Sequence, residues 1–305
     1  MKILSKLKIG LALGGGGARG AAHIGVLKVL HNNNIIPDII GGTSAGAFIG
    51  AMYAATMDPA WIEKRFTEFL GSEAYEEMGV NRLQSDQNPE SVIGQVTKYV
   101  QERVVFAMAL TRTSIIKKER LANAFKFLLP VRTFEELKMP LNVYATDLHS
   151  GETICYDSGD LIDAVTQSGS IPGFVEPTEY DDKLLVDAGV SAPLPIRELK
   201  HKADFIIGSD ISRGAPKKPI KKVNIIEIIT RAERITSQYY TDMLADQSDF
   251  LIKPDVLGLH WSEFDKYDIL VKNGQMAADE KIDELIAAIK YRKSLRYRLL
   301  HLSSN

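Results

Sequence analysis

Ser44 lies at the centre of the pentapeptide Gly42-Thr43-Ser44-Ala45-Gly46, which has the pattern Gly-x-Ser-x-Gly. A short apolar run precedes it and small, helix-favouring residues follow. The spacing therefore predicts a nucleophile elbow, a strand-to-helix turn that pushes the serine hydroxyl into a cleft. Gly42 and Gly46 are expected to be required because a Cβ at either position would clash in the strained turn. Gly-rich turns also occur for packing reasons alone, so the pentapeptide by itself leaves both interpretations open.

A glycine loop, Gly14-Gly15-Gly16-Gly17-Ala18-Arg19-Gly20, precedes this pentapeptide in the sequence. It lies between an expected strand from Lys8 to Leu13 and an expected helix from Ala18 to Leu30, and a second strand is expected from Asp38 to Gly41. A right-handed crossover between two parallel strands brings their carboxyl ends to one edge of the sheet. The loop and Ser44 are therefore expected to face one crevice.

The glycine loop has three interpretations. Gly15 to Gly20 matches the dinucleotide pattern G-x-G-x-x-G, but the acidic residue expected after the second strand is missing, and so is the Lys-Ser/Thr ending of a Walker A loop. Consecutive glycines can also turn several backbone N–H groups towards one point and hold the negative oxygen of a tetrahedral intermediate. A serine across the crevice favours this third use.

Two residues are candidates for the base that a serine nucleophile needs. Asp187 follows the expected short strand from Leu184 to Val186 and begins the tripeptide Asp187-Ala188-Gly189. The carboxyl end of a strand is where α/β folds keep functional groups, although a turn-initiating aspartate has the same pattern. His23, in the first turn of the helix after the glycine loop, is either a general base or a packed structural residue.

The composition limits the classes of function. The chain has 305 residues, 45% hydrophobic and 25% charged, with a formal net charge of -2 and one cysteine, Cys155. We therefore expect no nucleic-acid partner, no intrachain disulfide, no metal site and no cofactor. The apolar run from Ile9 to Leu13 is shorter than the roughly 7–15 residues of a signal peptide, and no stretch approaches the ~20 apolar residues of a membrane span. A soluble cytoplasmic protein, or one attached to a membrane surface, is expected.

The remaining patterns predict the other helices, strands and turns of a single domain. Asp58-Pro59 should begin a helix that ends near Leu70, Asp160 should cap a helix that ends at Gln167, and Ser150-Gly151 should form a hairpin turn. Further strands are expected at Leu141 to Ala145 and Asp204 to Ser209, and further helices at Glu90 to Leu110, Ile115 to Leu129, Asn224 to Leu244 and Ala277 to Leu300. The helices between residues 90 and 129 either cap the crevice or pack in the core.

Basic residues gather in two stretches near the C-terminus. One is the Pro-broken loop from Lys217 to Lys222, and the other is the end of the last expected helix. That helix end carries Lys290, Arg292, Lys293, Arg296 and Arg298, interleaved with tyrosine and leucine. It can lie on an anionic membrane surface as a peripheral contact, or it can pack through its apolar face with cations favoured by the helix dipole.

Taken together, these stretches resemble the patatin-like phospholipase family, in particular its bacterial members. The resemblance runs from about residue 9 to residue 195. It rests on the segments 15–20 and 42–46 and on Asp187-Ala188-Gly189, with Ser170-Ile171-Pro172-Gly173 as a further match. It implies a three-layer α/β/α fold with a mostly parallel central sheet and a nucleophile elbow. We expect one domain over residues 1–305, with a C-terminal helical part from about 224 to 305.

The resemblance also implies roles for individual residues. Ser44 would be the nucleophile and Asp187 the base of a Ser-Asp dyad, and the backbone of Gly15, Gly16 and Gly17 would form the oxyanion hole, supported by Arg19 and Gly20. The implied activity is acyl-ester hydrolysis of phospholipids or lysophospholipids through an acyl-serine intermediate, with no prediction of an oligomer.

One departure from the family is Ala188, where glycine is usual. A positive φ there would cost roughly 1 kcal/mol or change the aim of Asp187. An acyltransferase that uses Ser44, and a non-catalytic lipid-binding or regulatory protein on the same fold, remain alternatives.

Overall fold

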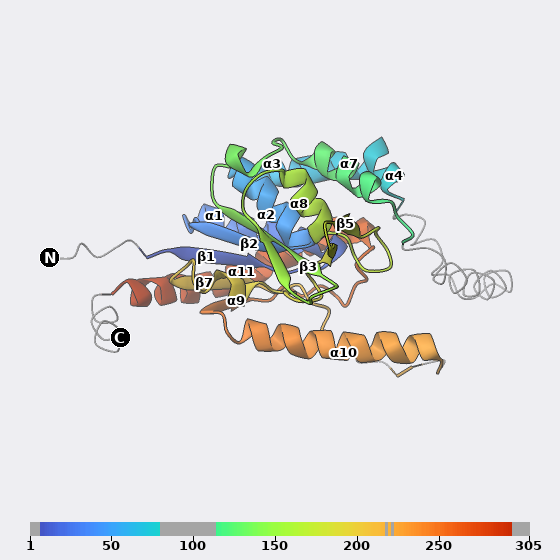
Figure 1. Ribbon diagram of the computed structural model, residues 1–305. Helices are drawn as coiled ribbons and strands as arrows, with labels where there is room; N and C mark the ends of the chain where they lie inside the picture. The colour runs from blue at the N-terminus through green and yellow to red at the C-terminus, as the bar shows by residue number, and fades with distance from the viewer. Residues whose placement is uncertain (1–6, 80–113, 217–218, 221–222, 295–305) are drawn as a thin grey trace.

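The computed structural model describes residues 7–79, 114–216, 219–220 and 223–294. A central sheet has the strand order β5-β6-β3-β2-β1-β7-β8, with β4 also paired to β3 (Figure 1). The strands are β1 (Ile9–Leu13), β2 (Ile39–Thr43), β3 (Leu141–Asp147), β4 (Thr153–Tyr156), β5 (Thr178–Tyr180), β6 (Lys183–Asp187), β7 (Phe205–Ser209) and β8 (Phe250–Ile252). Neighbours among β3, β2, β1, β7 and β8 are parallel, whereas β4 and β6 are antiparallel to β3. The sheet is therefore mostly parallel, as predicted.

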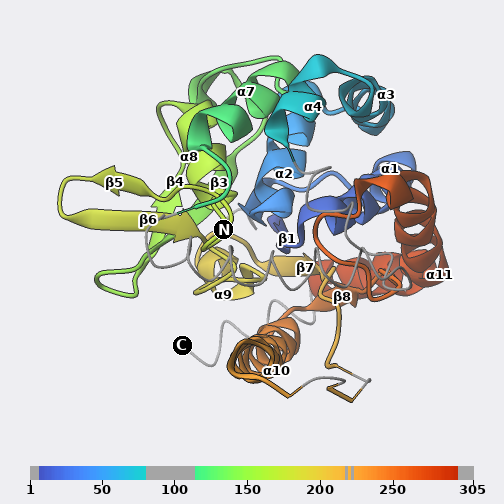
Figure 2. The same cartoon turned by 90° about the vertical axis from the view of Figure 1, so that its right-hand side faces the viewer.

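Helices lie on both faces of this sheet, in layers of unequal thickness (Figures 1 and 2). The helices of the thicker layer are α1 (Ala21–Asn32), α2 (Ala45–Thr56), α3 (Pro59–Leu70), α4 (Glu73–Met78), α7 (Lys118–Leu128), α8 (Leu161–Ser168) and α11 (Tyr267–Lys293). The thinner layer contains α9 (Ile196–Leu199) and α10 (Ile225–Ala245), and short 3-10 helices lie at η1 (Gly17–Gly20), η2 (Phe134–Glu136) and η3 (Phe264–Lys266). This arrangement is the predicted three-layer α/β/α fold.

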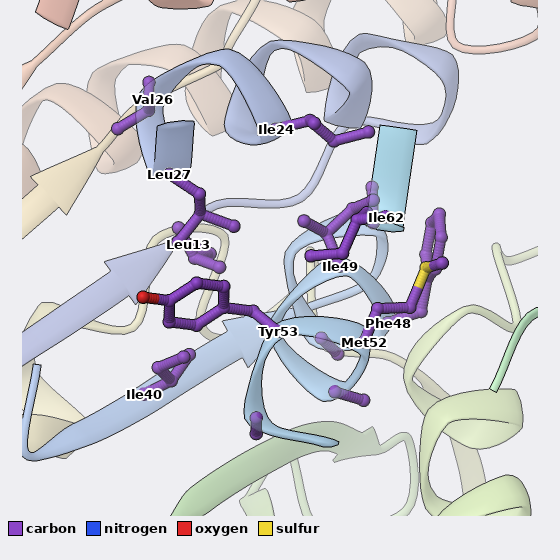
Figure 3. Packing of buried hydrophobic residues seen from close by; sticks show 14 of the residues in the cluster. Leu13, Ile24, Val26, Leu27, Ile40, Phe48, Ile49, Met52, Tyr53 and Ile62 are labelled. Atoms are coloured by element: carbon purple, nitrogen blue, oxygen red, sulfur yellow. The ribbon is translucent and has the colours of Figure 1, made fainter. Parts of the chain in front are cut away.

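The alternation of side chains along the strands divides the core into a larger and a smaller cluster. In β1, Leu11 and Leu13 point into the larger cluster, whereas Ala12 points into the smaller one, as the period of two requires. Figure 3 shows part of the larger cluster, where Leu13 lies among Ile40, Leu27 and Tyr53. The smaller cluster is covered by α9 and, from α10, by Ala245 near the end of that helix.

Most of the predicted turns and helix starts are confirmed. The side chain of Asp58 accepts hydrogen bonds from the first turn of α3, and the side chain of Asp160 accepts one from the first turn of α8. Gly151 takes a φ of 77° in the turn between β3 and β4, where a glycine is favoured. The helix expected from Glu90 to Leu110 lies outside the described residues.

Three helices begin elsewhere than predicted. α1 begins at Ala21 rather than Ala18, because Gly17–Gly20 form the 3-10 helix η1. α7 begins at Lys118 because Ile116 is extended in a parallel bridge with Val175, where its N–H donates to the carbonyl of Phe174 at 2.7 Å. α11 begins at Tyr267, ten residues before the expected start, and continues through Gly274, which usually weakens a helix. A Cβ on Gly274 would lie 1.9 Å from the carbonyl oxygen of Ala22, so this glycine permits backbone contact between α11 and α1.

Candidate active site

Ser44 occupies the sharp turn between β2 and α2. Its φ of 53° and ψ of -120° lie in a region that residues with a side chain rarely adopt. The backbone N–H of Ser44 donates to Oγ of Ser168 at 2.9 Å, and the hydroxyl of Thr43 donates to the carbonyl of Ala192 at 2.6 Å. These two hydrogen bonds support the strained turn from neighbouring loops.

The glycines on either side of Ser44 allow backbones to meet at the elbow. A Cβ on Gly42 would lie 2.5 Å from the carbonyl oxygen of Gly46, and a Cβ on Gly46 would lie 2.1 Å from the carbonyl oxygen of Leu13. Real Cβ atoms do not approach backbone so closely. The elbow is therefore packed directly on the end of β1.

Asp187, at the end of β6, is 5% exposed and lies beside Ser44. The Ser44 hydroxyl is close enough to this carboxylate to act as a donor that lowers its pKa. Oδ1 of Asp187 also accepts a hydrogen bond from the backbone N–H of Gly189 at 2.7 Å. Burial raises the pKa of Asp187 to about 6, against the opposing effect of these two donors. A carboxylate with this pKa is ionised at neutral pH and can accept a proton from the serine.

The register of the sheet explains how Asp187 reaches Ser44. Thr43 pairs with Tyr144 of β3, and the next residue of β3, Ala145, pairs with Asp187. Asp187 lies at the carboxyl end of its strand, as predicted, and this strand, β6, is antiparallel to β3. β6 enters the sheet from beyond the carboxyl edge, and Asp187 is its innermost residue.

The backbone at Ala188 is not strained. Ala188 is fully buried and is not among the described residues with a positive φ, so the condition under which alanine would cost stability there does not arise. Asp187 is further fixed by its own N–H, which donates to the carbonyl of Ser170 at 2.9 Å. Ser168, the last residue of α8, thus holds Ser44, and Ser170, two residues later, holds Asp187. The sequence pattern singled out Ser170 but did not indicate the role of Ser168.

The glycine loop lies against Ser44, and its N–H groups have different partners. A Cβ on Gly15 would lie 3.3 Å from Cβ of Ser44. The N–H of Gly15 donates to the carbonyl of Pro193 at 2.9 Å. Among the hydrogen bonds of the described residues, none is donated by the N–H of Gly16 or Gly17. Of the three N–H groups expected to form an oxyanion hole, that of Gly15 is therefore engaged with a carbonyl, whereas those of Gly16 and Gly17 are not.

The glycine loop is anchored by residues that the sequence patterns did not connect to it. The N–H of Ala18 donates to the carbonyl of Trp261 at 2.7 Å. Gly17 has a φ of 57°, and a Cβ there would lie 2.4 Å from the same carbonyl oxygen. Nε of Arg19 donates to the carbonyl of Gly16 at 3.0 Å, and a Cβ on Gly20 would lie 2.6 Å from the side chain of Ala45. No sequence signal pointed to Trp261, because its contribution is a backbone carbonyl.

His23 is fully buried beneath the loop and both of its ring nitrogens are engaged. Nε2 lies 2.9 Å from the carbonyl oxygen of Gly14, and Nδ1 lies 2.8 Å from Oγ of Ser209. A carbonyl only accepts, so Nε2 carries the proton and the Ser209 hydroxyl donates to Nδ1. Burial lowers the pKa of His23 to about 4, which keeps the ring neutral. This geometry fits a structural histidine rather than a base for Ser44.

An apolar cavity extends from Ser44 into the thicker layer. Ser44 and Gly17 form part of its wall, and much of the remainder is apolar side chains of α2, α3 and α7. These include Phe48, Phe66, Phe69, Leu121, Phe125 and Leu128. The cavity can accept an apolar chain whose ester group lies at Ser44.

The described ranges contain neither a cluster that could bind a metal ion nor a helix that could span a membrane. No group of three or more histidine, cysteine, aspartate or glutamate side chains in these residues could hold a metal ion. Within the same residues, no helix is both long enough and apolar enough to cross a membrane.

Comparisons with known proteins show which family the chain resembles. A family model described as patatin-like phospholipase matches residues 11–200. An uncharacterised NTE family protein of Mycobacterium tuberculosis is 28% identical over 77% of this chain, which spans 58% of that protein. Lysophospholipase NTE1 of Debaryomyces hansenii is 26% identical over 72% of this chain, which spans 13% of that protein. The crystal structure of VipD from Legionella pneumophila aligns with a TM-score of 0.49 at 16% identity, over 92% of this chain and 67% of that one.

Proposed function

Because the chain belongs to the patatin-like phospholipase family, we propose that it hydrolyses acyl esters of phospholipids or lysophospholipids, with Ser44 as nucleophile and Asp187 as general base. One observation carries this proposal. A strained serine beside a buried carboxylate lies in the wall of an apolar cavity. The name of the relative Lysophospholipase NTE1 supports lysophospholipids as one class of substrate.

In the proposed acylation step, Oγ of Ser44 attacks the ester carbonyl carbon while Asp187 accepts the hydroxyl proton. The N–H groups of Gly16 and Gly17 stabilise the negative oxygen of the tetrahedral intermediate. When the intermediate collapses, the bond to the leaving alcohol breaks and Asp187 donates its proton to that oxygen. The acyl chain, now esterified to Ser44, stays in the apolar cavity.

In the deacylation step, a water molecule attacks the acyl-serine and Asp187 accepts its proton. Collapse of the second intermediate releases the fatty acid, and the proton on Asp187 returns to Ser44. A pKa near 6 suits both halves of this cycle, because the group is ionised before attack and is a moderate acid afterwards. A two-residue site of this kind favours esters over amides, whose leaving groups need stronger acid assistance.

A fluorophosphonate probe tests the nucleophile directly. We expect the probe to label the wild-type protein at Ser44, and Ser44→Ala to remove both labelling and ester hydrolysis with little change in the thermal midpoint. Ser158→Ala, at an exposed serine, is the matched control and should label normally. Labelling of the Ser44→Ala variant, or wild-type turnover by it, would refute the assignment. Transfer of the acyl group to an added alcohol in preference to water would instead identify an acyltransferase.

A further inference from the structure

Helix α10 extends beyond the edge of the sheet at which Ser44 lies. Its last residues cover the smaller core, and just after the helix the N–H of Asp249 donates to the carbonyl of Ile206, near the start of β7. Earlier in the helix, the hydroxyl of Tyr240 donates to the carbonyl of Ser191, in the loop after Asp187. The helix is therefore antiparallel to β7, and residues before Tyr240 lie progressively further past the carboxyl edge. At 1.5 Å per residue, Ile225 lies about 20 Å beyond Tyr240.

The projecting half of α10 exposes large apolar side chains. Ile225 is 75% exposed, Ile228 50% and Ile229 63%, and Ile235 continues the row one to two turns later. The buried side chains of the helix lie in its second half, from Gln238 onwards. Figure 1 shows α10 set apart from the sheet, and Figure 2 shows it nearly end-on. A contiguous exposed apolar surface of this kind marks an interaction site.

Arginines gather between this half-helix and the oxyanion loop. Nε of Arg213 donates to the carbonyl of Gly258, and a terminal nitrogen of Arg234 donates to the carbonyl of Gly214. Burial lowers the pKa of Arg213, and the nearby charge of Arg234 lowers it further. Burial likewise lowers the pKa of Arg234, and the nearby charge of Arg231 lowers it further. The side chains are thus close enough to repel one another. Within the described part of the chain, Nε of Arg234 is buried without a hydrogen-bond partner.

Acidic groups also lie near the cluster. Glu263 faces Arg213, and Asp210, which is paired with Lys253 at 2.8 Å, faces Arg19. On α10 itself, Glu227 lies one helical turn before Arg231, and Glu233 lies next to Arg234. The charges that act most strongly on Arg213 and Arg234 are nevertheless those of neighbouring arginines, which places positive charge beside the exposed isoleucines.

We propose that the N-terminal half of α10, together with Arg213, Arg231 and Arg234, forms the surface on which this protein docks to an anionic lipid bilayer. The isoleucines would enter the boundary between head groups and acyl chains, and the guanidinium groups would bind lipid phosphates. This orientation presents the carboxyl edge of the sheet, and with it Ser44, to the lipid. The exposed side chains of Val190 and Leu257 lie in loops that follow strands at the same edge.

A second copy of the chain fits this surface less well. A two-fold contact through the same face would bring each arginine cluster close to its counterpart, and like charges in partly buried surroundings oppose such a contact. A bilayer with acidic head groups supplies both the apolar medium and the opposite charge. This proposal rests on the proposed function in one respect, because a protein that hydrolyses phospholipids has to reach a bilayer.

Vesicle binding tests the proposal without turnover when the full chain carries Ser44→Ala. We expect that protein to sediment with mixed phosphatidylcholine and phosphatidylglycerol vesicles and much less with pure phosphatidylcholine vesicles. In the same background, adding Ile225→Ser, Ile228→Ser and Ile229→Ser together should lower the partition coefficient by about tenfold per isoleucine. Adding Arg231→Gln and Arg234→Gln instead should lower it by about fivefold per arginine and weaken its dependence on salt.

The matched control is Ile269→Ser with Met276→Ser, which removes two exposed apolar side chains from α11 and should leave binding unchanged. Unchanged binding by the triple isoleucine variant, with a normal thermal midpoint, would overturn the proposal. A dimer mass by light scattering that falls to the monomer mass in that variant would also overturn it. Failure of the Ser44→Ala protein to bind the anionic vesicles, while the wild-type protein is labelled normally by the fluorophosphonate, would refute this surface alone. Vesicle binding by a wild-type protein that shows no esterase activity would refute only the hydrolysis.

Discussion

Replacing Asp187 with asparagine should abolish activity and at the same time stabilise the protein at high pH. The asparagine keeps the volume of the aspartate, and its carbonyl oxygen can still accept the N–H of Gly189. In the wild type, a pKa of about 6 against an ordinary value of 3.8 means that ionising Asp187 costs the folded state about 3 kcal/mol. The variant avoids this cost because it cannot ionise.

The sign follows from proton linkage. Asp187 has a raised pKa in the folded state, so its favourable contribution is complete below pH 4 and is lost as the pH rises through about 6. We therefore expect Asp187→Asn to match the wild type at pH 4 and to exceed it by up to about 3 kcal/mol at pH 8. For a protein of this size, this difference corresponds to a rise in the thermal midpoint of roughly 5 °C.

Urea titrations at pH 4, 6 and 8 would measure this difference. The control is Asp147→Asn, because hydrogen bonds from Ser150, His149 and Leu184 lower the pKa of Asp147 to about 2. Asp147→Asn should therefore lose stability at pH 8 and approach the wild type as the pH falls towards 2. If Asp187→Asn raised the free energy of unfolding equally at every pH, or lowered it at pH 8, the inference that burial opposes the ionisation of Asp187 would be refuted.

The other predictions concern the rate, the loop, the cavity and metals. The kcat of Asp187→Asn should fall by at least ~10²–10⁴-fold, and the acid limb of kcat/KM near pH 6 in the wild type should be missing from its residual activity. His23→Ala should leave the carbonyl of Gly14 unpaired and lose about 1–3 kcal/mol of unfolding free energy while keeping that acid limb; a dead enzyme with unchanged stability would point instead to a catalytic histidine. Ala124→Leu should fill part of the cavity and shift preference from long to short acyl esters, whereas Asn123→Leu, exposed on the same helix, should not. A chelator should leave ester hydrolysis intact, and strict calcium dependence would contradict the proposed mechanism.

Residues whose roles follow from a local sequence pattern were predictable from the sequence. Ser44 and the glycines beside it could be identified because an elbow needs these residue types at this spacing, whatever the rest of the chain does. The starts of α3 and α8 could be identified because an aspartate side chain satisfies the free N–H groups of a first helical turn.

Features that depend on long-range pairing were less accessible. The direction of β6 is set by its pairing with β3, and the apolar pattern of the three residues from Leu184 to Val186 carries no information on direction. The engagement of Gly15 depends on Pro193, and the two interpretations of His23 were separated only by the positions of Gly14 and Ser209. The exposed half of α10 has the composition of an ordinary amphipathic helix, so only the structure shows that much of its apolar face is uncovered.

The backbone contact between α1 and α11 sets an order of events during synthesis. α1 follows the oxyanion loop and carries His23, yet the chain that packs against it at Gly25 and Gly274 leaves the ribosome about 250 residues later. The carbonyl of Trp261 that anchors the loop is also made late. Under the proposed mechanism, a nascent chain that already contains Ser44 and Asp187 would have its nucleophile and its base before the glycine loop is fixed. The proposed activity would then arise only near the end of translation.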